Sequence, residues 1–344
     1  MKRSIRLAVL AIGAVAALVA VAVAFAAYTS PKLQVSYNGA ITNITASASP
    51  NDDATAVASI YIPTGTTITA NQSPGTQIGT VKAQVQALAL GGALLPLDGK
   101  IMVAPPGAVP AAAQTACTQG ATPTATWLLV LAAAGQVINL PAYLIPTAGA
   151  EAALGPAKLV FCLAPPDIPV AQGGATFGAK FLSAALSVQG VFSPVAQGAW
   201  VAFWTPWQAG NGQVSPAATV VSPAAVAPGA VTAKAKKAGN GAVVAGLVTQ
   251  GGIPRPAAVV QIWGAKGKAA LRKLGTVKTG AKGTYSFRAK SGDVFQAQAV
   301  GAPIAAPPLC TLVSAQLKAA GINFPCVNPT ANGFTAKSGL ARKK

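Results

Sequence analysis

The chain of 344 residues has no histidine and only six acidic residues. Without an imidazole, Ser-His-Asp and Cys-His catalytic groups and histidine metal sites are excluded. The acidic residues stand in turn-like contexts, and they are Asp52, Asp53, Asp98, Glu151, Asp167 and Asp293. The sequence therefore predicts a protein that is not an enzyme and that carries no metal or cofactor. The alternative is a hydrolase that pairs two of these carboxylates across roughly 5 to 9.5 Å.

Helix-forming patterns are also scarce. Alanine is abundant, but it falls among Val, Thr, Pro and Gly. The chain has 36 glycines and 27 prolines among its 344 residues. That share is lower than in low-complexity disorder, and a hydrophobic content of 52% is enough to build a core. Short β-branched runs between Gly and Pro turns predict an all-β protein. Along two of these runs the period of two predicts the strand faces: Ile60 and Ile62 lie opposite Tyr61, and Trp204 lies opposite Phe203.

The first 26 residues read as a signal peptide. A basic start is followed by an uncharged apolar run and by Ala24-Phe25-Ala26, a small-x-small cleavage site. The alternative is an uncleaved membrane anchor, because residues 7–27 are long enough to span a bilayer. In both cases we expect the rest of the chain to be extracellular or associated with the cell envelope, and the composition is typical of bacteria.

Four cysteines, an even number, suit an exported protein with disulfide bonds. Four cysteines allow three pairings. Sequence order favours Cys117–Cys162 and Cys310–Cys326, because a composition break near residues 210–240 separates the two pairs. Metal binding is the weaker alternative, since the chain has neither a CxxC motif nor a histidine.

Positive charge is concentrated in the last third of the chain. Residues 28–232 hold five basic and five acidic residues, whereas residues 233–344 hold 17 basic residues and one acid, a net charge of +16. This asymmetry predicts two domains with different surfaces. We expect a large β-sandwich domain at 28–208, a Pro/Ala-rich linker at 209–240 and a basic β-sandwich domain at 241–344, with Ig-like or prealbumin-like folds.

The basic domain carries a recognisable order of strands and turns. Tyr285 and Phe287, two residues apart, share one face of a strand directly after a glycine turn. The pattern comprises Gly246, Val248, Gly252, Pro254, Ala258, Val260, Ile262, Gly275, Thr276, Thr279, Gly283, Tyr285 and Phe287. Over about 241–301 it resembles the prealbumin-like β-sandwich modules of carboxypeptidase regulatory-like bacterial domains, although Ala281-Lys282 replace the usual Asp or Asn.

This resemblance implies a non-catalytic module for adhesion or spacing. It also implies that both aromatic side chains fill the core and that Gly283 supplies a positive φ at the end of the turn. Beyond residue 301 we expect a short helix or an irregular excursion between the last two cysteines, and a closing edge strand within 332–339.

Basic residues of this domain form a candidate polyanion-binding surface. The candidates are Lys266, Lys268, Arg272, Lys273, Lys278, Lys282, Arg288 and Lys290. The expected partners are anionic cell-envelope polymers or lipid headgroups. Specific nucleic-acid binding is not expected, because the aromatic residues that interleave with cations in single-strand binders are missing. The alternative is that these cations only maintain solubility.

Trp200, Trp204 and Trp207 form a second candidate site, since indoles on an exposed strand face can stack on sugars or other flat ligands. The alternative is a strand whose tryptophans belong to the core. Two functions therefore remain: a non-enzymatic structural or adhesion protein, or a carbohydrate-active or carbohydrate-binding protein that uses the tryptophan face. Two carboxylates close together beside Trp200 or Trp204 would favour the second.

Overall fold

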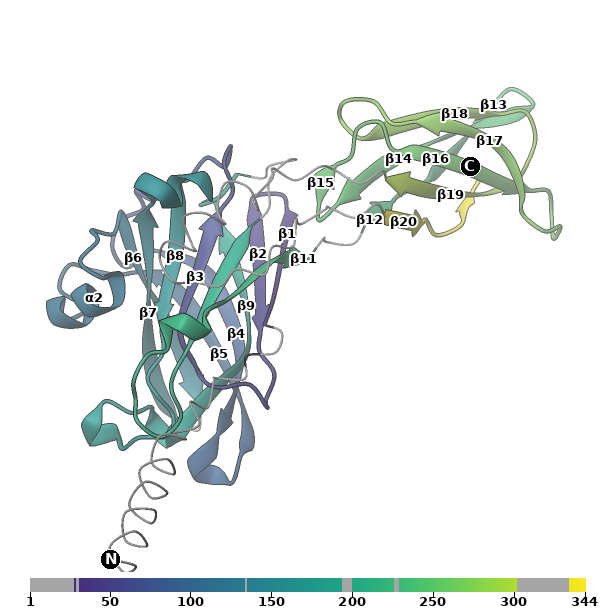
Figure 1. Cartoon of the computed structure of the whole chain (residues 1–344). Coiled ribbons are helices and arrows are strands. Elements are labelled where there is room, and N and C mark those ends of the chain that lie inside the picture. The colour runs from purple at the N-terminus through teal and green to yellow at the C-terminus, as the bar shows by residue number, and fades with distance from the viewer. Residues whose placement is uncertain (1–27, 29–30, 134, 194–199, 226–228, 302–333) are drawn as a thin grey trace, which may run out of the picture.

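The computed structural model describes residues 28, 31–133, 135–193, 200–225, 229–301 and 334–344. Within this part the protein is all-β, as the sequence predicts, and its one α-helix is the short α2 (Ala111–Thr118). The strands form a large barrel and, beyond it, two smaller antiparallel sheets (Figure 1). None of the described helices is long and apolar enough to cross a membrane.

Eleven strands form the barrel, and each hydrogen-bonds to two neighbours. They are β1 (Lys32–Asn38), β2 (Ile41–Ser47), β3 (Thr55–Ile62), β4 (Gln77–Ala87), β5 (Ala93–Val103), β6 (Ala125–Ala133), β7 (Gln136–Pro146), β8 (Ala157–Cys162), β9 (Ala179–Gln189), β10 (Val201–Pro206) and β11 (Val220–Ala225). Their order around the barrel is β1-β11-β10-β3-β8-β7-β6-β5-β4-β9-β2. The two-sheet sandwich expected for this domain is therefore wrong, because the sheet closes on itself through β1, which pairs with β2 on one side and in parallel with β11 on the other.

The closing strand comes from the segment expected to be a linker. Pro216 opens the short 3-10 turn η5 (Pro216–Ala218), where its missing N–H leaves no bond unmade. β11 then pairs with β10, and β12 (Gly229–Val231) and β13 (Lys234–Ala238) pair with β14 (Gly241–Gln250). Residues 209–240 thus contain paired strands rather than an extended spacer. The linker was predicted because prolines recur there among small residues, a composition that is typical of spacers.

The inward and outward faces of the barrel strands follow the period of two expected of β-structure. On β3, Ile60 and Ile62 point to the interior whereas Tyr61 packs outside, as predicted. On and beside β10, Trp200 and Trp204 point inward whereas Phe203 points outward. The predicted faces of both strands are therefore confirmed.

The two ends of the barrel differ. The connections β4–β5, β6–β7, β8–β9 and β10–β11 share one end, here called the β8–β9 end, because antiparallel neighbours alternate in direction. These connections contain the turns η1 (Leu88–Leu90), η3 (Val170–Gln172) and η4 (Thr176–Gly178). At the opposite, β1–β2 end, Phe192 contacts Trp127 and Trp200 edge-on at centroid distances of 6.1 and 5.3 Å. Large rings therefore fill that end.

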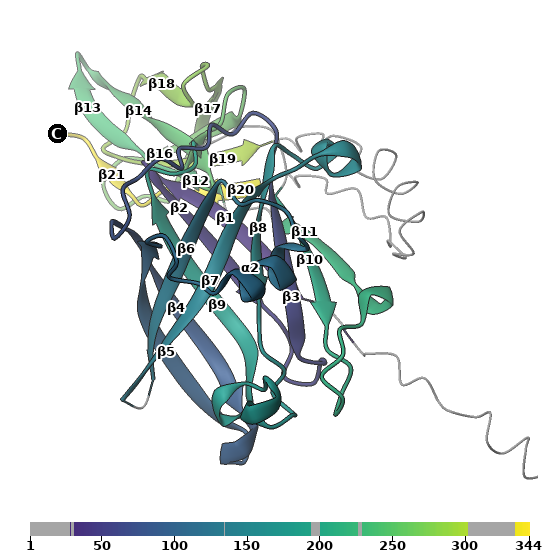
Figure 2. The same ribbon diagram turned by 90° about the vertical axis from the view of Figure 1, so that its left-hand side faces the viewer.

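A disulfide bond fixes α2 to the outside of the barrel. Cys117 in α2 is bonded to Cys162 at the end of β8, which confirms the first predicted pair. The helix region covers Tyr143, Ile145 and Val160 on the outer face of β7 and β8, and Figure 2 looks at this side of the barrel. The other predicted pair, Cys310–Cys326, lies outside the described residues. So do the helix or irregular excursion expected between these cysteines and the predicted signal peptide at residues 1–26.

The part of the chain after the barrel is here called the basic unit (described residues 229–301 and 334–344). One of its sheets contains β12, β13, β14, β15 (Ile253–Pro254) and β18 (Thr284–Ala289). The other contains β16 (Val259–Ala265), β17 (Arg272–Lys278), β19 (Val294–Gly301), β20 (Phe334–Lys337) and β21 (Ala341–Arg342). Side chains from both sheets share one hydrophobic core.

The aromatic pair of β18 belongs to this core. Tyr285 is 4% exposed and Phe287 packs against the same cluster. Gly283 has φ of 70°, and a Cβ there would lie 2.7 Å from the Val248 carbonyl oxygen, so a glycine is required. The predicted core face, the positive φ and the edge strand after residue 332, which is β20, are therefore confirmed.

Candidate functional site

The cations of the basic unit are its most conspicuous surface feature. Of the 16 lysines and arginines that the structure describes from residue 233 onward, 14 are exposed. The exceptions are Arg255, which is buried with its guanidinium 5.7 Å from the centre of the Phe334 ring, and Lys343, which is half-buried. All eight candidates for polyanion binding are among the exposed residues.

Strand register brings distant cations together on the outer face of the first sheet. Lys236 of β13 and Arg288 of β18 both lie opposite Val243 of β14, so all three side chains point to the same face. Two strand spacings put the Cα atoms of Lys236 and Arg288 about 10 Å apart. Lys234, two residues before Lys236, shares this face. In the sequence Lys236 and Arg288 are 52 residues apart, so the sequence alone gave no sign that they share one face.

Other cations lie on the second sheet and on the turns. Lys278 of β17 is opposite Val259, and Lys337 of β20 is opposite Gln298, on the outer face of that sheet. Lys266 and Lys268 occupy the β16–β17 turn, with Arg272 and Lys273 at the start of β17, and Lys282 and Lys290 flank β18. The candidates thus surround the unit instead of converging on one pocket.

Asp293 supplies the one negative side chain of residues 233–344. Its carboxylate lies 3.3 Å from the Lys343 ammonium group and accepts a hydrogen bond from the Gly267 N–H at 3.4 Å. The bond from Lys343, followed by that from Gly267, holds the pKa of this carboxyl below its ordinary value. One carboxylate therefore offsets little of the positive charge on the unit.

The acidic residues of the barrel are distributed over separate structural contacts. Asp98 forms an exposed ion pair with Lys82 at 3.6 Å, and Asp167 accepts a hydrogen bond from the backbone N–H of Gly210. Asp52 is buried and accepts a bond from the Ser49 N–H at 3.2 Å. Among the described residues, no group of three or more Cys, Asp and Glu side chains could hold a metal ion.

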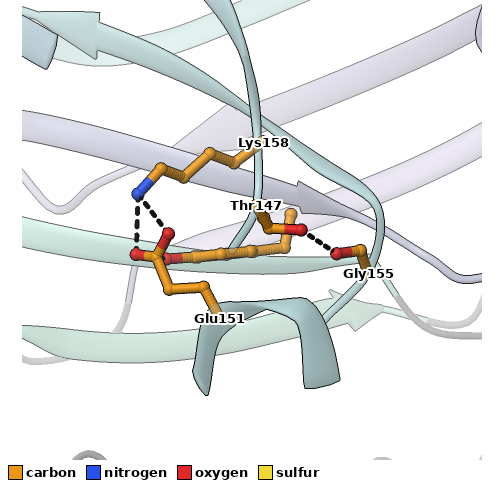
Figure 3. Close-up of polar contacts among 5 residues, drawn as sticks. Thr147, Glu151, Gly155 and Lys158 are labelled. Atoms are coloured by element: carbon orange, nitrogen blue, oxygen red, sulfur yellow. Dashed lines mark hydrogen bonds and ion pairs between the residues drawn. The ribbon is translucent and has the colours of Figure 1, made fainter. Parts of the chain in front are cut away.

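Glu151 is the most strongly engaged carboxylate. It lies on the turn η2 (Gly149–Ala153), where both of its oxygens accept bonds from the Lys158 ammonium group at 2.6 and 2.7 Å (Figure 3). The Tyr61 hydroxyl donates to the same carboxylate at 2.8 Å, and the Lys158 ammonium group lies 5.6 Å from the centre of the Tyr61 ring. The sequence did not indicate this cluster, which fastens η2 over the outer apolar patch that contains Tyr61 and Phe203.

Two of the three tryptophan candidates lie within the barrel rather than on an exposed face. Trp200 and Trp204 are 3% and 1% exposed, and their indole N–H groups donate to the Tyr37 and Ser222 hydroxyls. Trp207 is half-buried and donates to the Leu163 carbonyl oxygen at 3.1 Å. Trp200 and Trp204 thus occupy core positions instead of the exposed stacking face that the sequence allowed, because ring closure turns this side of β10 toward the barrel interior.

Comparison with known proteins adds no assignment to these surfaces: no protein-family model matches the chain, and no curated protein matches it.

Proposed function

We propose that this is a non-enzymatic protein of the cell envelope or the extracellular space, in which the basic unit attaches the barrel to anionic envelope polymers or lipid headgroups. The observation that carries this proposal is the set of 14 exposed cations on one unit, against a barrel segment with no net charge. Because the cations surround the unit, they favour attraction to an extended anionic surface over recognition of one small ligand.

For the basic unit we propose the prealbumin-like sandwich of carboxypeptidase regulatory-like modules, supported by two sheets around one core and by the positions of Gly283, Tyr285 and Phe287. Export of the chain and a second disulfide, Cys310–Cys326, belong to the same proposal. The Cys117–Cys162 bond supports export, since disulfides persist in oxidising compartments. A carbohydrate-active function has less support, because no acidic residue is among the described residues that line the space beside Trp204.

A charge-matched pair of triple variants tests the attachment. Replacing Lys266, Lys268 and Lys273 by Gln removes three exposed cations near the β16–β17 turn. Replacing Lys32, Lys82 and Lys100 by Gln removes three exposed cations from the barrel and gives the same net charge. We expect the first variant to bind vesicles of an anionic phospholipid at least about tenfold more weakly than wild type, since a lysine near such a surface contributes about 1 kcal/mol.

The barrel variant is expected to bind as wild type does, and vesicles of a zwitterionic phospholipid should bind none of the three proteins. A linear polyphosphate serves as the polymer probe in a parallel titration. Equal weakening by the two triple variants would show that overall charge, and not the basic unit, governs binding, and the proposal would then be abandoned.

A further inference from the structure

A cavity of about 370 Å³ lies inside the barrel, toward the β8–β9 end. Its wall includes inward-facing alanines from four strands, Ala46 of β2, Ala58 of β3, Ala83 of β4 and Ala184 of β9. Phe181 and Trp204 form an aromatic part of the wall, with ring centroids 6.2 Å apart and an angle of 21° between the ring planes.

The position of the cavity follows from the sizes of the inward-facing side chains. Eight strands give a barrel that its own side chains just fill, so an interior surrounded by eleven strands is wider. At the β1–β2 end, Trp127, Phe192 and Trp200 occupy this extra width. At the β8–β9 end, alanines occupy inward-facing positions, so their small side chains leave the cavity unfilled. The cost of an empty cavity rises with its volume, which favours an occupant.

The wall determines the chemistry of that occupant. Among the described residues that line the cavity none is charged, and most are Ala, Val, Leu, Ile or Phe. The polar hydrogen of Trp204 is already donated to Ser222 at 2.6 Å, so it is not offered to a ligand. The polar side chains of the lining are few, Thr55, Asn139 and Thr176, and the Thr55 hydroxyl already bonds to that of Tyr28. Water needs two to four polar partners, so a wall that is mostly apolar favours an apolar molecule.

The size of the cavity and the residues around its β8–β9 end also favour a small apolar occupant. An apolar cavity of about 150 Å³ holds benzene, so one of this size has room for roughly 15 non-hydrogen atoms. Leu163, Ala164, Gly174 and Thr176 of the β8–β9 connection belong to the lining. Six of the eight exposed large hydrophobic residues in the described part lie in or beside connections at this end, and they are Leu88, Leu90, Leu94, Val137, Val170 and Val214.

We propose that the barrel is a binding site for a small, uncharged, predominantly hydrocarbon ligand, which enters at the β8–β9 end and lies against Phe181 and Trp204. This function is independent of the cationic surface, because the ligand carries no charge and the cavity wall offers none. The barrel would then be a carrier, and the basic unit would hold it at an anionic surface.

The test uses the full chain and N-phenyl-1-naphthylamine, an uncharged aromatic probe whose fluorescence rises in apolar surroundings. Ala184→Phe places a ring in the cavity. Ala185→Phe, one residue further along β9, adds the same ring to the outer, exposed face and is the matched control. We expect one probe per wild-type chain, a loss of affinity of at least about tenfold in Ala184→Phe, as expected when a filled pocket excludes its ligand, and no loss in Ala185→Phe.

Salt separates this site from the basic unit, since probe binding should not change between low and high salt. If Ala184→Phe does not fold, Ala58→Leu on the facing strand β3 fills part of the same space and should also weaken binding. The proposal is overturned if both cavity variants, shown by circular dichroism to be folded, bind the probe as tightly as wild type. It is equally overturned if binding is lost only on replacing Leu88 and Leu90 by Ser, because the exposed rim would then be the site.

Discussion

Above about pH 10, where tyrosine ordinarily ionises, the folded protein is expected to lose stability steeply, and none of its tyrosines should ionise before it unfolds. All five tyrosines of the chain have raised pKa values, and burial is the first cause in each case. For Tyr28, which donates to or accepts from the Thr55 hydroxyl, the pKa rises to about 12. For Tyr61, the neighbouring Glu151 carboxylate adds to the effect of burial.

The direction follows from proton binding. Below pH 10 both states keep their phenol protons and the stabilisation is complete, whereas above it the unfolded chain releases protons that the folded protein retains. A tyrosine lowers the free energy of unfolding by about 1.4 kcal/mol per pH unit until the pH reaches its pKa in the folded protein. Tyr28, whose pKa is about 12, therefore accounts for up to about 2.7 kcal/mol near pH 12. Burial lowers the pKa of Lys180 from its ordinary value of 10.5. Over the pH range just below 10.5 this group therefore makes the free energy of unfolding rise with pH, opposite to the tyrosines.

Ultraviolet absorbance of tyrosinate, recorded together with circular dichroism, checks this expectation. The five phenols should ionise in one transition that coincides with unfolding. In Tyr28→Phe, the four remaining phenols should ionise in that transition. The number of protons released on unfolding, obtained from the slope of stability against pH, should be smaller by one. Ionisation of any tyrosine near pH 10 in protein that is still folded would contradict the burial described here.

Loss of the Cys117–Cys162 bond is expected to lower the free energy of unfolding by about 4 kcal/mol. The bond closes a loop over a sequence separation of 45 residues, and the chain-entropy relation for a loop of that length gives this value. Locally, α2 would be released from Tyr143, Ile145 and Val160, which it helps to cover. Because the barrel strands are paired independently of α2, we expect the fold to persist at reduced stability.

Denaturant unfolding of the double variant Cys117→Ser/Cys162→Ser, compared with wild type, measures the loss. Peptide mapping of the unreduced wild-type protein is the control for connectivity. A peptide that links Cys117 or Cys162 to Cys310 or Cys326 would contradict the pairing, and an unchanged denaturation midpoint would show that the loop is restrained by other contacts.

Local patterns in the sequence predicted the faces of individual strands. The spacing of Tyr285 and Phe287 placed both in a core, and the alternation around Trp204 placed it opposite Phe203. Both predictions depend only on the period of two along one strand. The first disulfide was also predicted, because sequence order favours one of the three pairings that four cysteines allow.

Ring closure and the cavity were not predictable in this way. β1 meets β11 through Leu33 and Ala224, which lie 191 positions apart, and no local pattern specifies that contact. The exposed tryptophan face was wrong for the same reason, since only closure decides which side of β10 is interior. The cavity depends on the number of strands together with the sizes of inward residues such as Ala58 and Ala184, and strand number comes only from the closed sheet.

The salt dependence of wild-type binding to anionic vesicles and to polyphosphate tests most directly whether charge on the basic unit provides attachment. The screening length falls from about 30 Å at 0.01 M salt to about 8 Å at 0.15 M. We predict an affinity that decreases steadily over this range and is nearly abolished at about 0.5 M, where exposed charges are almost fully screened. Binding that persists unchanged at about 0.5 M salt would contradict electrostatic attachment and would direct attention to the apolar end of the barrel instead.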